Sequence, residues 1–344
     1  MRPAKSAPKT TRVTLKDIAR AAGVSPMTVS YALRGSAEVS AKQRKRVQAI
    51  AEKLGYRPDP LLTHLMAHLR AGRRTPKTSA NLALLMMWEP PFVSRLIAGA
   101  TQRANKLGYA LDRIDLRTET NTAALTRTLM ARGVAGLVLA PLLDPGMYRD
   151  LLDWNQFAAT AMTYSLTKLS VNRVVTHHFE NSVRTFALLR ERGYKRIGLA
   201  MTPDMEFRAN HSYSGAYFRL TPMDGQTTFP VLMFEGDIQR AVTRWFARYR
   251  PDAVVLANSN HFNDSIRPFI SPAVLRNTAF VSLDSDPTHG VAGIDQMFEV
   301  IGSQSVDDVV AQILHNERGF RPTPTVTMIE GKWAEADGLI PRLK

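Results

Sequence analysis

The chain of 344 residues contains no cysteine, and no apolar run approaches the roughly 18 residues that a membrane-spanning helix needs. Without thiols, the sequence excludes disulfide frameworks, thiolate metal ligands and cysteine nucleophiles. The first residues are basic but lack the apolar segment of a secretion signal. These absences predict a soluble cytoplasmic protein, and its length is enough for more than one domain.

Signatures of catalysis are also missing. The sequence has no Gly-x-Ser-x-Gly elbow, no phosphate-binding loop and no dinucleotide fingerprint. Its eight histidines are scattered and lack the spacing of a metal site with a third acidic or thiolate ligand, which favours loop or surface histidines. We therefore expect no enzyme activity, no metal and no cofactor.

Acidic residues are scarce at one end of the chain. Residues 1–78 hold 17 Lys and Arg against 4 Asp and Glu, whereas the remaining residues hold 28 against 26. A basic stretch of this kind is the electrostatic footprint of a nucleic-acid-binding region. The Pro, Lys, Ser and Thr of residues 1–12 favour a disordered basic arm ahead of that region.

Residues 13–58 predict three short helices. Thr14 precedes an apolar-periodic run and has Asp17 three residues on, which is the spacing of a capping box. Gly23 supplies the turn, and Ser25 with the following proline can start a second helix. Ser40 opens a third helix with an apolar inner face and a basic outer one. Two helices joined by a tight turn indicate a helix-turn-helix domain.

The segment Val24-Ser-Pro-Met-Thr-Val-Ser30 and the spacing of residues from Val39 to Pro58 resemble the head of the LacI/GalR (lactose-repressor) family of bacterial transcription regulators. In that family the start of the second helix reads bases in the major groove. The resemblance therefore places Pro26, Met27 and Tyr31 at base-reading positions. Phosphate contacts are expected from Thr14, Ser25, Thr28, Ser30 and Arg44.

Tyr31 departs from the family pattern, in which arginine is frequent at this position. Arginine is the usual bidentate reader of guanine, whereas Met27 and Tyr31 offer apolar contacts to thymine methyl groups and one hydroxyl. The operator's outer bases would then be read differently. The alternative is that Tyr31 packs on the third helix, and the sequence leaves both interpretations open.

Residues 59–78 combine a proline-capped apolar stripe with flanking arginines. The resemblance identifies this segment as the hinge helix and linker, which in the family forms on operator DNA. Position matching puts Leu65 where a leucine of each protomer enters the minor groove, in keeping with the apolar wedges of minor-groove binders. The alternative is that the stripe packs against the core.

From residue 79 onward, buried strands alternate with amphipathic helices that end at glycine. This alternation predicts parallel sheets covered by helices. The resemblance implies a two-lobed α/β core like that of periplasmic binding proteins, joined to the all-α head and hinge helix. We expect the core to span residues 79–344, with lobe 1 near 79–163 and 293–320, lobe 2 near 164–292 and 321–344, and lobe crossings near 162–172, 286–293 and 316–322.

Ligands of such sheets bind beyond the carboxyl ends of the strands, which in a two-lobed protein is the cleft between lobes. The resemblance carries Asp284 onto the effector-binding aspartate, and Asn258 lies near the family's Asn-Asp pair, whose second member here is Ser259. Either Arg208 or His211 can supply a family cation, and the sequence does not decide between them. The candidate effector residues are Phe92, Tyr164, Arg208, His211, Asn258 and Asp284.

The resemblance implies a repressor of carbohydrate-utilisation genes. We expect a homodimer on a pseudo-palindromic double-stranded operator, with operator affinity set allosterically by a sugar-like effector. The absence of a heptad tail before Lys344 favours a dimer over a tetramer. The alternative is a DNA-binding regulator that responds to a non-sugar ligand such as a purine, or to no small molecule. The sequence names neither the operator nor the effector, nor the direction of regulation.

Overall fold

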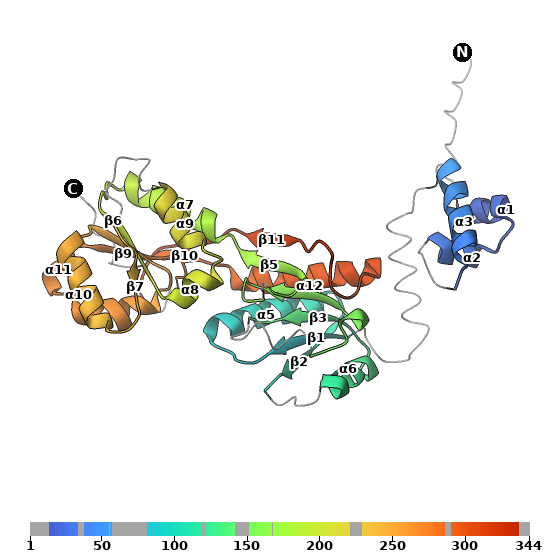
Figure 1. The fold of residues 1–344 in the computed structure, drawn as a ribbon, viewed down its shortest axis with the longest axis horizontal. Coiled ribbons are helices and arrows are strands. Elements are labelled where there is room, and N and C mark those ends of the chain that lie inside the picture. Colours follow the sequence, from blue (N-terminus) through green and yellow to red (C-terminus); the bar gives the residue numbers. More distant parts are fainter. Residues whose placement is uncertain are drawn as a thin grey trace, which may run out of the picture. The chain divides into compact units, whose positions relative to one another are not determined.

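The computed structural model describes residues 14–33, 38–54, 56, 81–117, 122–141, 151–166, 168–220, 229–285 and 290–336. They belong to two compact units, residues 1–76 and residues 77–344 (Figure 1). The expected basic arm of residues 1–12 and the hinge and linker of residues 59–78, including Leu65, lie outside the described residues. None of the described helices is both long and apolar enough to cross a membrane.

Three helices form the first unit, the head. They are α1 (Leu15–Ala22), α2 (Pro26–Leu33) and α3 (Ala41–Lys53). Helix α1 ends at Gly23, whose φ of 62° lies in the left-handed region that favours glycine. The Ser40 side chain caps α3 by accepting a hydrogen bond from the third helical amide at 3.3 Å. Each helix contributes a fully buried side chain to the core of the head: Ile18, Val29 and Val47.

The first lobe of the second unit is a parallel sheet in the order β11-β5-β4-β3-β1-β2. Along β1, Leu82 and Leu84 face one buried core while Ala83 and Leu85 face the other, because helices cover both sides of the sheet. Its strands are β1 (Asn81–Met86), β2 (Ala110–Asp115), β3 (Val134–Leu139), β4 (Ala158–Met162), β5 (Asn172–Thr176) and β11 (Val326–Ile329). Its helices are α5 (Pro91–Lys106), α6 (Thr122–Ala131), the short η1 (Trp154–Gln156) and α12 (Phe298–His315).

The second lobe has a sheet in the order β12-β10-β9-β8-β6-β7, parallel except where β12 pairs antiparallel with β10. Helices again cover both faces, which confirms the predicted α/β class. Its strands are β6 (Ile197–Met201), β7 (Leu232–Met233), β8 (Ala253–Leu256), β9 (Ala279–Ser282), β10 (Gly293–Asp295) and β12 (Lys332–Ala334). Its helices are α7 (His178–Glu191), α8 (Pro203–Arg208), α9 (Ser212–Leu220), α10 (Ile238–Tyr249), η3 (Phe262–Ile266), η4 (Arg267–Phe269) and α11 (Pro272–Asn277).

The chain crosses between the lobes later than the sequence indicated. The crossings lie between β5 and α7, between β10 and α12, and between β11 and β12. The expected crossings near 162–172, 286–293 and 316–322, and the lobe boundaries drawn from them, are therefore wrong. Residues 163–171 connect two neighbouring strands of the first sheet, and β5 satisfies its backbone groups by pairing with β11.

Helices α5 and α12 of the first lobe meet backbone to backbone. A Cβ atom added to Gly99 would overlap the carbonyl oxygen of Glu299, and one added to Gly302 would overlap that of Leu96. Neither neighbour is a flexible side-chain end that could move aside. Glycine at these two positions is what lets the helices approach this closely.

Gly302→Ala is therefore expected to lower the free energy of unfolding of the second unit by about 1–3 kcal/mol through overpacking. Gly215 is the matched control, because it also lies within a helix but has open space around it. Gly215→Ala should raise the free energy of unfolding by roughly 0.5–1 kcal/mol. All four tryptophans lie after residue 80, so urea denaturation followed by tryptophan fluorescence reports on this unit. Equal stability of the two variants would contradict the close contact.

Candidate functional site

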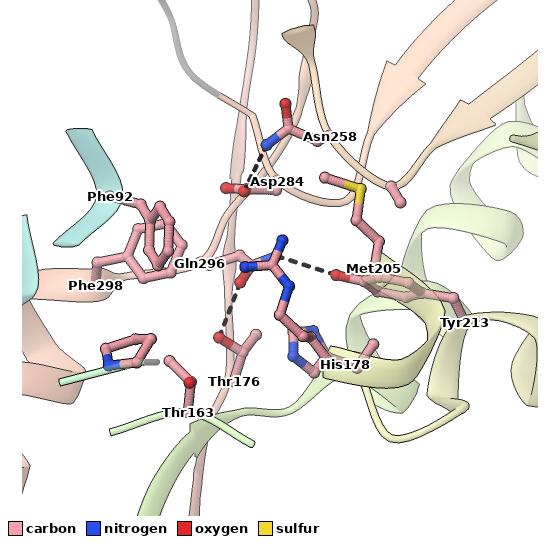
Figure 2. Close-up of a pocket in the computed structure, with 14 residues that line it drawn as sticks. Phe92, Thr163, Thr176, His178, Met205, Tyr213, Asn258, Asp284, Gln296 and Phe298 are labelled. Carbon is pink, nitrogen blue, oxygen red and sulfur yellow. Dashed lines mark hydrogen bonds between the residues drawn. The ribbon is translucent and has the colours of Figure 1, made fainter. Parts of the chain in front are cut away.

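A cavity of about 110 Å³ lies between the lobes of the second unit, where strands of both sheets end (Figure 2). The first lobe contributes Phe92 and Thr163 to its wall, and the second contributes Asn258 and Asp284. Asn258 follows β8 and Asp284 follows β9, so the rule that ligands bind at the carboxyl ends of parallel strands places both here. The volume is below the roughly 300 Å³ of pockets for drug-sized ligands, which suits a ligand of one ring.

The structure brings together four of the six candidate effector residues: Phe92, Arg208, Asn258 and Asp284. Tyr164 and His211 do not line the cavity. The Tyr164 ring packs 6.1 Å from the ring of His178. The His211 side chain is 71% exposed and lies 3.5 Å from a carboxylate oxygen of Glu206. Of the two cations that the sequence left open, Arg208 is the one at the cavity.

Asp284 carries the negative charge of the cavity. Asn258 Nδ2 donates to Asp284 Oδ2 at 2.9 Å, and Asn258 Oδ1 accepts from the backbone amide of Asn260 at 2.9 Å. Burial raises the pKa of Asp284 to about 6, while the hydrogen bond from Asn258 and the charges of Arg95 and Arg208 act in the opposite direction. Near neutral pH the carboxylate is mostly ionised, so it can accept hydrogen bonds from a ligand's hydroxyl groups.

Arg208 ends α8 and carries a charge that is already partly balanced. Its Nε lies 2.9 Å from Asp204 Oδ2, yet this buried Nε makes no hydrogen bond within the described part of the chain. The guanidinium has five N–H donors in all. Arg208 can therefore donate to a polar ligand without making the cavity strongly positive.

Arg95 of α5 bridges the two lobes beside the cavity. Its Nη2 donates to Asp295 Oδ1 at 2.9 Å, and its Nε donates to Glu299 Oε1 at 2.7 Å. Its guanidinium lies 5.4 Å from the centre of the Phe298 ring, which lines the cavity. These carboxylates raise the pKa of Arg95, and Arg95 in turn lowers the pKa of Glu299. Because Asp295 ends a strand of the second sheet and Glu299 starts α12 of the first lobe, this cluster joins the lobes.

The sequence analysis missed Gln296, the central residue of the cavity floor. Gln296 Nε2 donates to the Tyr213 hydroxyl at 3.2 Å and to the Leu283 carbonyl at 2.9 Å, and its Oε1 accepts from Thr176 Oγ1 at 3.0 Å (Figure 2). Thr176 belongs to the first sheet and the other two partners to the second lobe. Gln296 directly follows β10, so the strand-end rule that selected Asp284 applies to it as well. A strand of three residues gave too weak a pattern to reveal it.

His178 was expected to be a loop or surface histidine, and that expectation is wrong. It opens α7 and lines the cavity, with its ring 5.0 Å from the Tyr213 ring. Burial, with a smaller contribution from His177, lowers the pKa of His178 to about 3. The imidazole is therefore neutral at physiological pH. Within the described ranges no three His, Asp or Glu side chains form a group that could hold a metal ion.

The predicted base-reading residues lie on α2 of the head. Pro26 and Met27 are exposed at its start, with Met27 64% accessible. Tyr31 is half-buried and packs against the core of the head, which corresponds to the alternative that the sequence left open. Met27 therefore offers the larger free apolar surface for contact with bases.

The predicted phosphate-binding hydroxyls are partly paired with protein groups. Thr14 Oγ1 donates to Asp17 Oδ2 at 2.6 Å, and the Thr14 amide donates to the same oxygen at 2.9 Å. Ser25 Oγ accepts from the Thr28 amide at 3.0 Å and lies 2.9 Å from Thr28 Oγ1. Ser30 is half-buried on α2. These contacts cap α1 and α2, so a phosphate would have to share or replace them.

Arg44 has a structural contact that the sequence did not indicate. Its Nη2 donates to the Val39 carbonyl at 3.2 Å and so holds the turn before α3. The neighbouring Lys42, Lys45 and Arg46 are exposed on the same helix. These three side chains supply positive surface that is free to approach a phosphate backbone.

Comparisons with known proteins agree with this architecture. The family model described as bacterial regulatory proteins, lacI family, matches residues 14–59. The lactose operon repressor of Escherichia coli K12 is 25% identical over 319 residues, covering 86% of this chain and 83% of the repressor. The ribose operon repressor of the same strain is 25% identical over 272 residues, covering 70% of this chain and 79% of the repressor.

Solved structures show the same fold. The complex of the transcriptional regulator CelR with cellobiose has a TM-score of 0.57 at 20% identity, covering 95% of this chain and 99% of that one. The lac repressor dimer bound to operator and the anti-inducer ONPF has a TM-score of 0.54 at 20% identity, covering 96% and 99%. Together with the helix-turn-helix head and the paired parallel sheets, these matches identify residues 14–59 as the head of a lacI-family bacterial regulatory protein and show that the whole chain is similar to LacI/GalR transcriptional regulators.

Proposed function

We propose that this regulator is a homodimeric repressor of carbohydrate-utilisation genes, and that a neutral, hydroxyl-rich effector in the interlobe cavity sets its affinity for a pseudo-palindromic operator. It would act on DNA in the cytoplasm and not as an enzyme. The observation that carries the proposal is the cavity in which Asp284, Asn258 and Arg208 meet the rings of Phe92 and Phe298. The relatives named for the lactose and ribose operons support the same class of effector.

The chemistry of the cavity supports a neutral sugar. A carboxylate, an amide and a guanidinium can each bond to ring hydroxyls, while aromatic faces cover the apolar side of a sugar ring. An anionic sugar phosphate fits less well, because Arg208 lies beside Asp204 and Arg95 lies between Asp295 and Glu299. The described residues around the cavity therefore supply no unbalanced positive charge with which to hold a phosphate.

In this proposal, closure of the lobes couples effector binding to operator affinity. An effector that prefers one arrangement of the lobes shifts the population toward that arrangement. The Arg95 cluster and Gln296 both connect the lobes at the cavity, so they respond when the lobes move. In a dimer, a change in lobe closure changes the separation of the two heads and hence their fit to a pair of half-sites.

The DNA-binding part is tested by selecting sites from random double-stranded DNA with the full chain. We expect a pseudo-palindrome whose affinity falls by about 10³–10⁵ between about 50 and 200 mM salt, as for six to ten phosphate contacts. Two exposed residues of the head make a matched pair. Arg46→Gln should weaken binding to all sequences and reduce the salt slope by about one per half-site, whereas Met27→Ala should relax base preference with little change in slope. A salt slope near zero would contradict this part of the proposal.

The effector part is tested on the selected operator by fluorescence anisotropy. Neutral mono- and disaccharides, sugar phosphates, uronic acids and purines are added in turn. We expect a neutral saccharide to change operator affinity by a factor of about 5–150, the usual range of allosteric coupling. A response only to a purine, or to none of the compounds, would overturn the sugar effector while leaving the DNA-binding function in place.

A further inference from the structure

Two neutral polar rings on the second-lobe side of the cavity have hydrogen-bonding capacity that the described residues do not use. The rings of His178 and Tyr213 lie 5.0 Å apart and nearly perpendicular, and both line the cavity (Figure 2). His178 Nδ1 is fully buried and has no hydrogen-bond partner among the described residues. The Tyr213 hydroxyl accepts a bond from Gln296, but its own hydrogen has no acceptor among the described residues.

Unused polar groups of this kind point to a ligand. Leaving a buried donor or acceptor unpaired costs about 1–3 kcal/mol, so most such groups in native proteins are paired. Here one such atom, His178 Nδ1, belongs to a residue that lines the same cavity as Tyr213, whose hydroxyl hydrogen has no acceptor among the described residues. The cavity is therefore built to receive a partner that can satisfy both.

The protonation states of His178 and Tyr213 limit which chemical group that partner can present. His178 is neutral, because burial lowers its pKa to about 3, and so offers one N–H donor and one acceptor nitrogen. Burial also raises the pKa of Tyr213, which keeps its hydroxyl protonated. A charged group would gain nothing special from two neutral rings. A hydroxyl group, which both accepts and donates, matches them.

Gln296 fixes the direction of the tyrosine's hydrogen bond. Both hydrogens of its amide nitrogen are used, one on the Tyr213 hydroxyl and one on the Leu283 carbonyl. Thr176 holds the amide oxygen from the other lobe and so keeps the side chain in this orientation. Because the Tyr213 oxygen already accepts from Gln296, its remaining strong interaction is to donate its own hydrogen.

We propose that His178 and Tyr213 together recognise one hydroxyl group of the effector, with Tyr213 donating to the hydroxyl oxygen and His178 accepting the hydroxyl hydrogen. This inference rests on the proposed function and deepens it by assigning two specificity-determining residues to the same cavity. A ligand that lacks this hydroxyl leaves both rings unpaired in a buried site. Sites built to hydrogen-bond a substrate hydroxyl discriminate strongly against analogues that lack it.

The variants that test it are Tyr213→Phe and His178→Phe, which remove the hydrogen-bonding atoms but keep an aromatic ring. Tyr217→Phe is the matched control, because Tyr217 is a second buried tyrosine of α9 that does not line the cavity. Its hydroxyl bonds to the Phe229 backbone instead, accepting from the amide at 3.0 Å and donating to the carbonyl at 3.1 Å. Tyr217→Phe therefore removes buried hydrogen bonds without altering the cavity, whereas the first two variants change the cavity itself.

Calorimetry with neutral mono- and disaccharides and their monodeoxy analogues gives the first measurement. For a saccharide that binds, we expect Tyr213→Phe and His178→Phe each to weaken binding about tenfold or more, and Tyr217→Phe to leave it within about twofold. One monodeoxy analogue should bind the unmodified chain about tenfold more weakly, with little further loss in Tyr213→Phe. Unchanged affinity in both cavity variants would overturn the inference and leave the proposed effector class standing.

Nitrogen NMR of ¹⁵N-histidine-labelled full chain, titrated with glycerol as a minimal hydroxyl probe, gives a second measurement that needs no sugar. The His178 signal is assigned by its absence in His178→Phe. We expect a saturable shift of its acceptor nitrogen that Tyr213→Phe weakens and Tyr217→Phe leaves unchanged. If no saccharide binds but glycerol gives this shift, hydroxyl recognition stands and the sugar effector falls. If neither a saccharide nor glycerol has an effect, the sugar effector and the hydroxyl recognition by His178 and Tyr213 are both overturned.

Discussion

Asp284→Asn is expected to stabilise the second unit above pH 6 and, at the same time, to weaken the binding of a neutral sugar by about tenfold or more. Burial raises the pKa of this carboxyl from 3.8 to about 6. The folded chain therefore holds the proton more tightly than the unfolded chain does. The stability linked to this proton is fully present below about pH 4 and is lost as the pH rises to about 6. The loss is on the order of 3 kcal/mol, and asparagine, which does not ionise, avoids it.

The check is urea denaturation at about pH 4 and about pH 8, followed by tryptophan fluorescence, together with calorimetry of the sugar. Asp115→Asn is the control, because Asp115 is bonded to Arg117 and its pKa is lowered to about 2. That variant should gain no stability at high pH and should leave sugar affinity unchanged. If Asp284→Asn differed from the unmodified chain by the same amount at both pH values, burial of a charge would not be the cause.

If Asp284→Asn both raised stability and weakened binding, this would explain why a carboxylate that is costly to bury is present at the cavity. The amide of Asn258 and the charges of Arg95 and Arg208 compensate only part of the cost of burying Asp284. A sugar hydroxyl would supply a further hydrogen bond to the charged form, which lowers the pKa again. Chains that bind a ligand commonly keep such destabilising groups because the bound state needs them.

The parts of the fold that depend on neighbouring residues could be predicted from the sequence. The turn at Gly23 and the cap at Ser40 follow from one backbone conformation and one side-chain bond within a few residues. The lobe crossings could not be predicted in the same way. They depend on the pairing of β5 with β11, which lie about 150 residues apart, and no local pattern states which sheet a short strand will join.

Some residues of the candidate site could likewise be predicted from the sequence, and others could not. Asp284 and Asn258 follow strands with clear apolar patterns, so the strand-end rule located them. His178 follows β5, and the rings of Tyr164 and Tyr213 pack beside it from other segments. Its burial removes its charge and makes it a neutral hydrogen-bonding group, which no spacing of histidines in the sequence could indicate.

Gln296→Leu is expected to lower both the free energy of unfolding and the affinity for a sugar. It removes the bonds to Tyr213, the Leu283 carbonyl and Thr176, and each partner that stays buried and unpaired costs about 1–3 kcal/mol. The Tyr213 hydroxyl also loses the bond that orients it toward the cavity. The affinity should therefore fall about tenfold, corresponding to the loss of one well-directed hydrogen bond.

Gln312→Leu separates this effect from a general loss of stability. Gln312 is also a buried glutamine, but its amide nitrogen donates to the Ala159 carbonyl at 3.2 Å and to Asp308 Oδ2 at 2.8 Å, both within the first lobe. Its loss should destabilise the unit in urea by a similar amount and leave calorimetric affinity within about twofold. Equal losses of affinity in the two variants would mean that a general loss of stability, and not the bonds of Gln296, weakens binding. A loss confined to Gln296→Leu would mean that the hydrogen bonds joining the lobes hold the binding geometry.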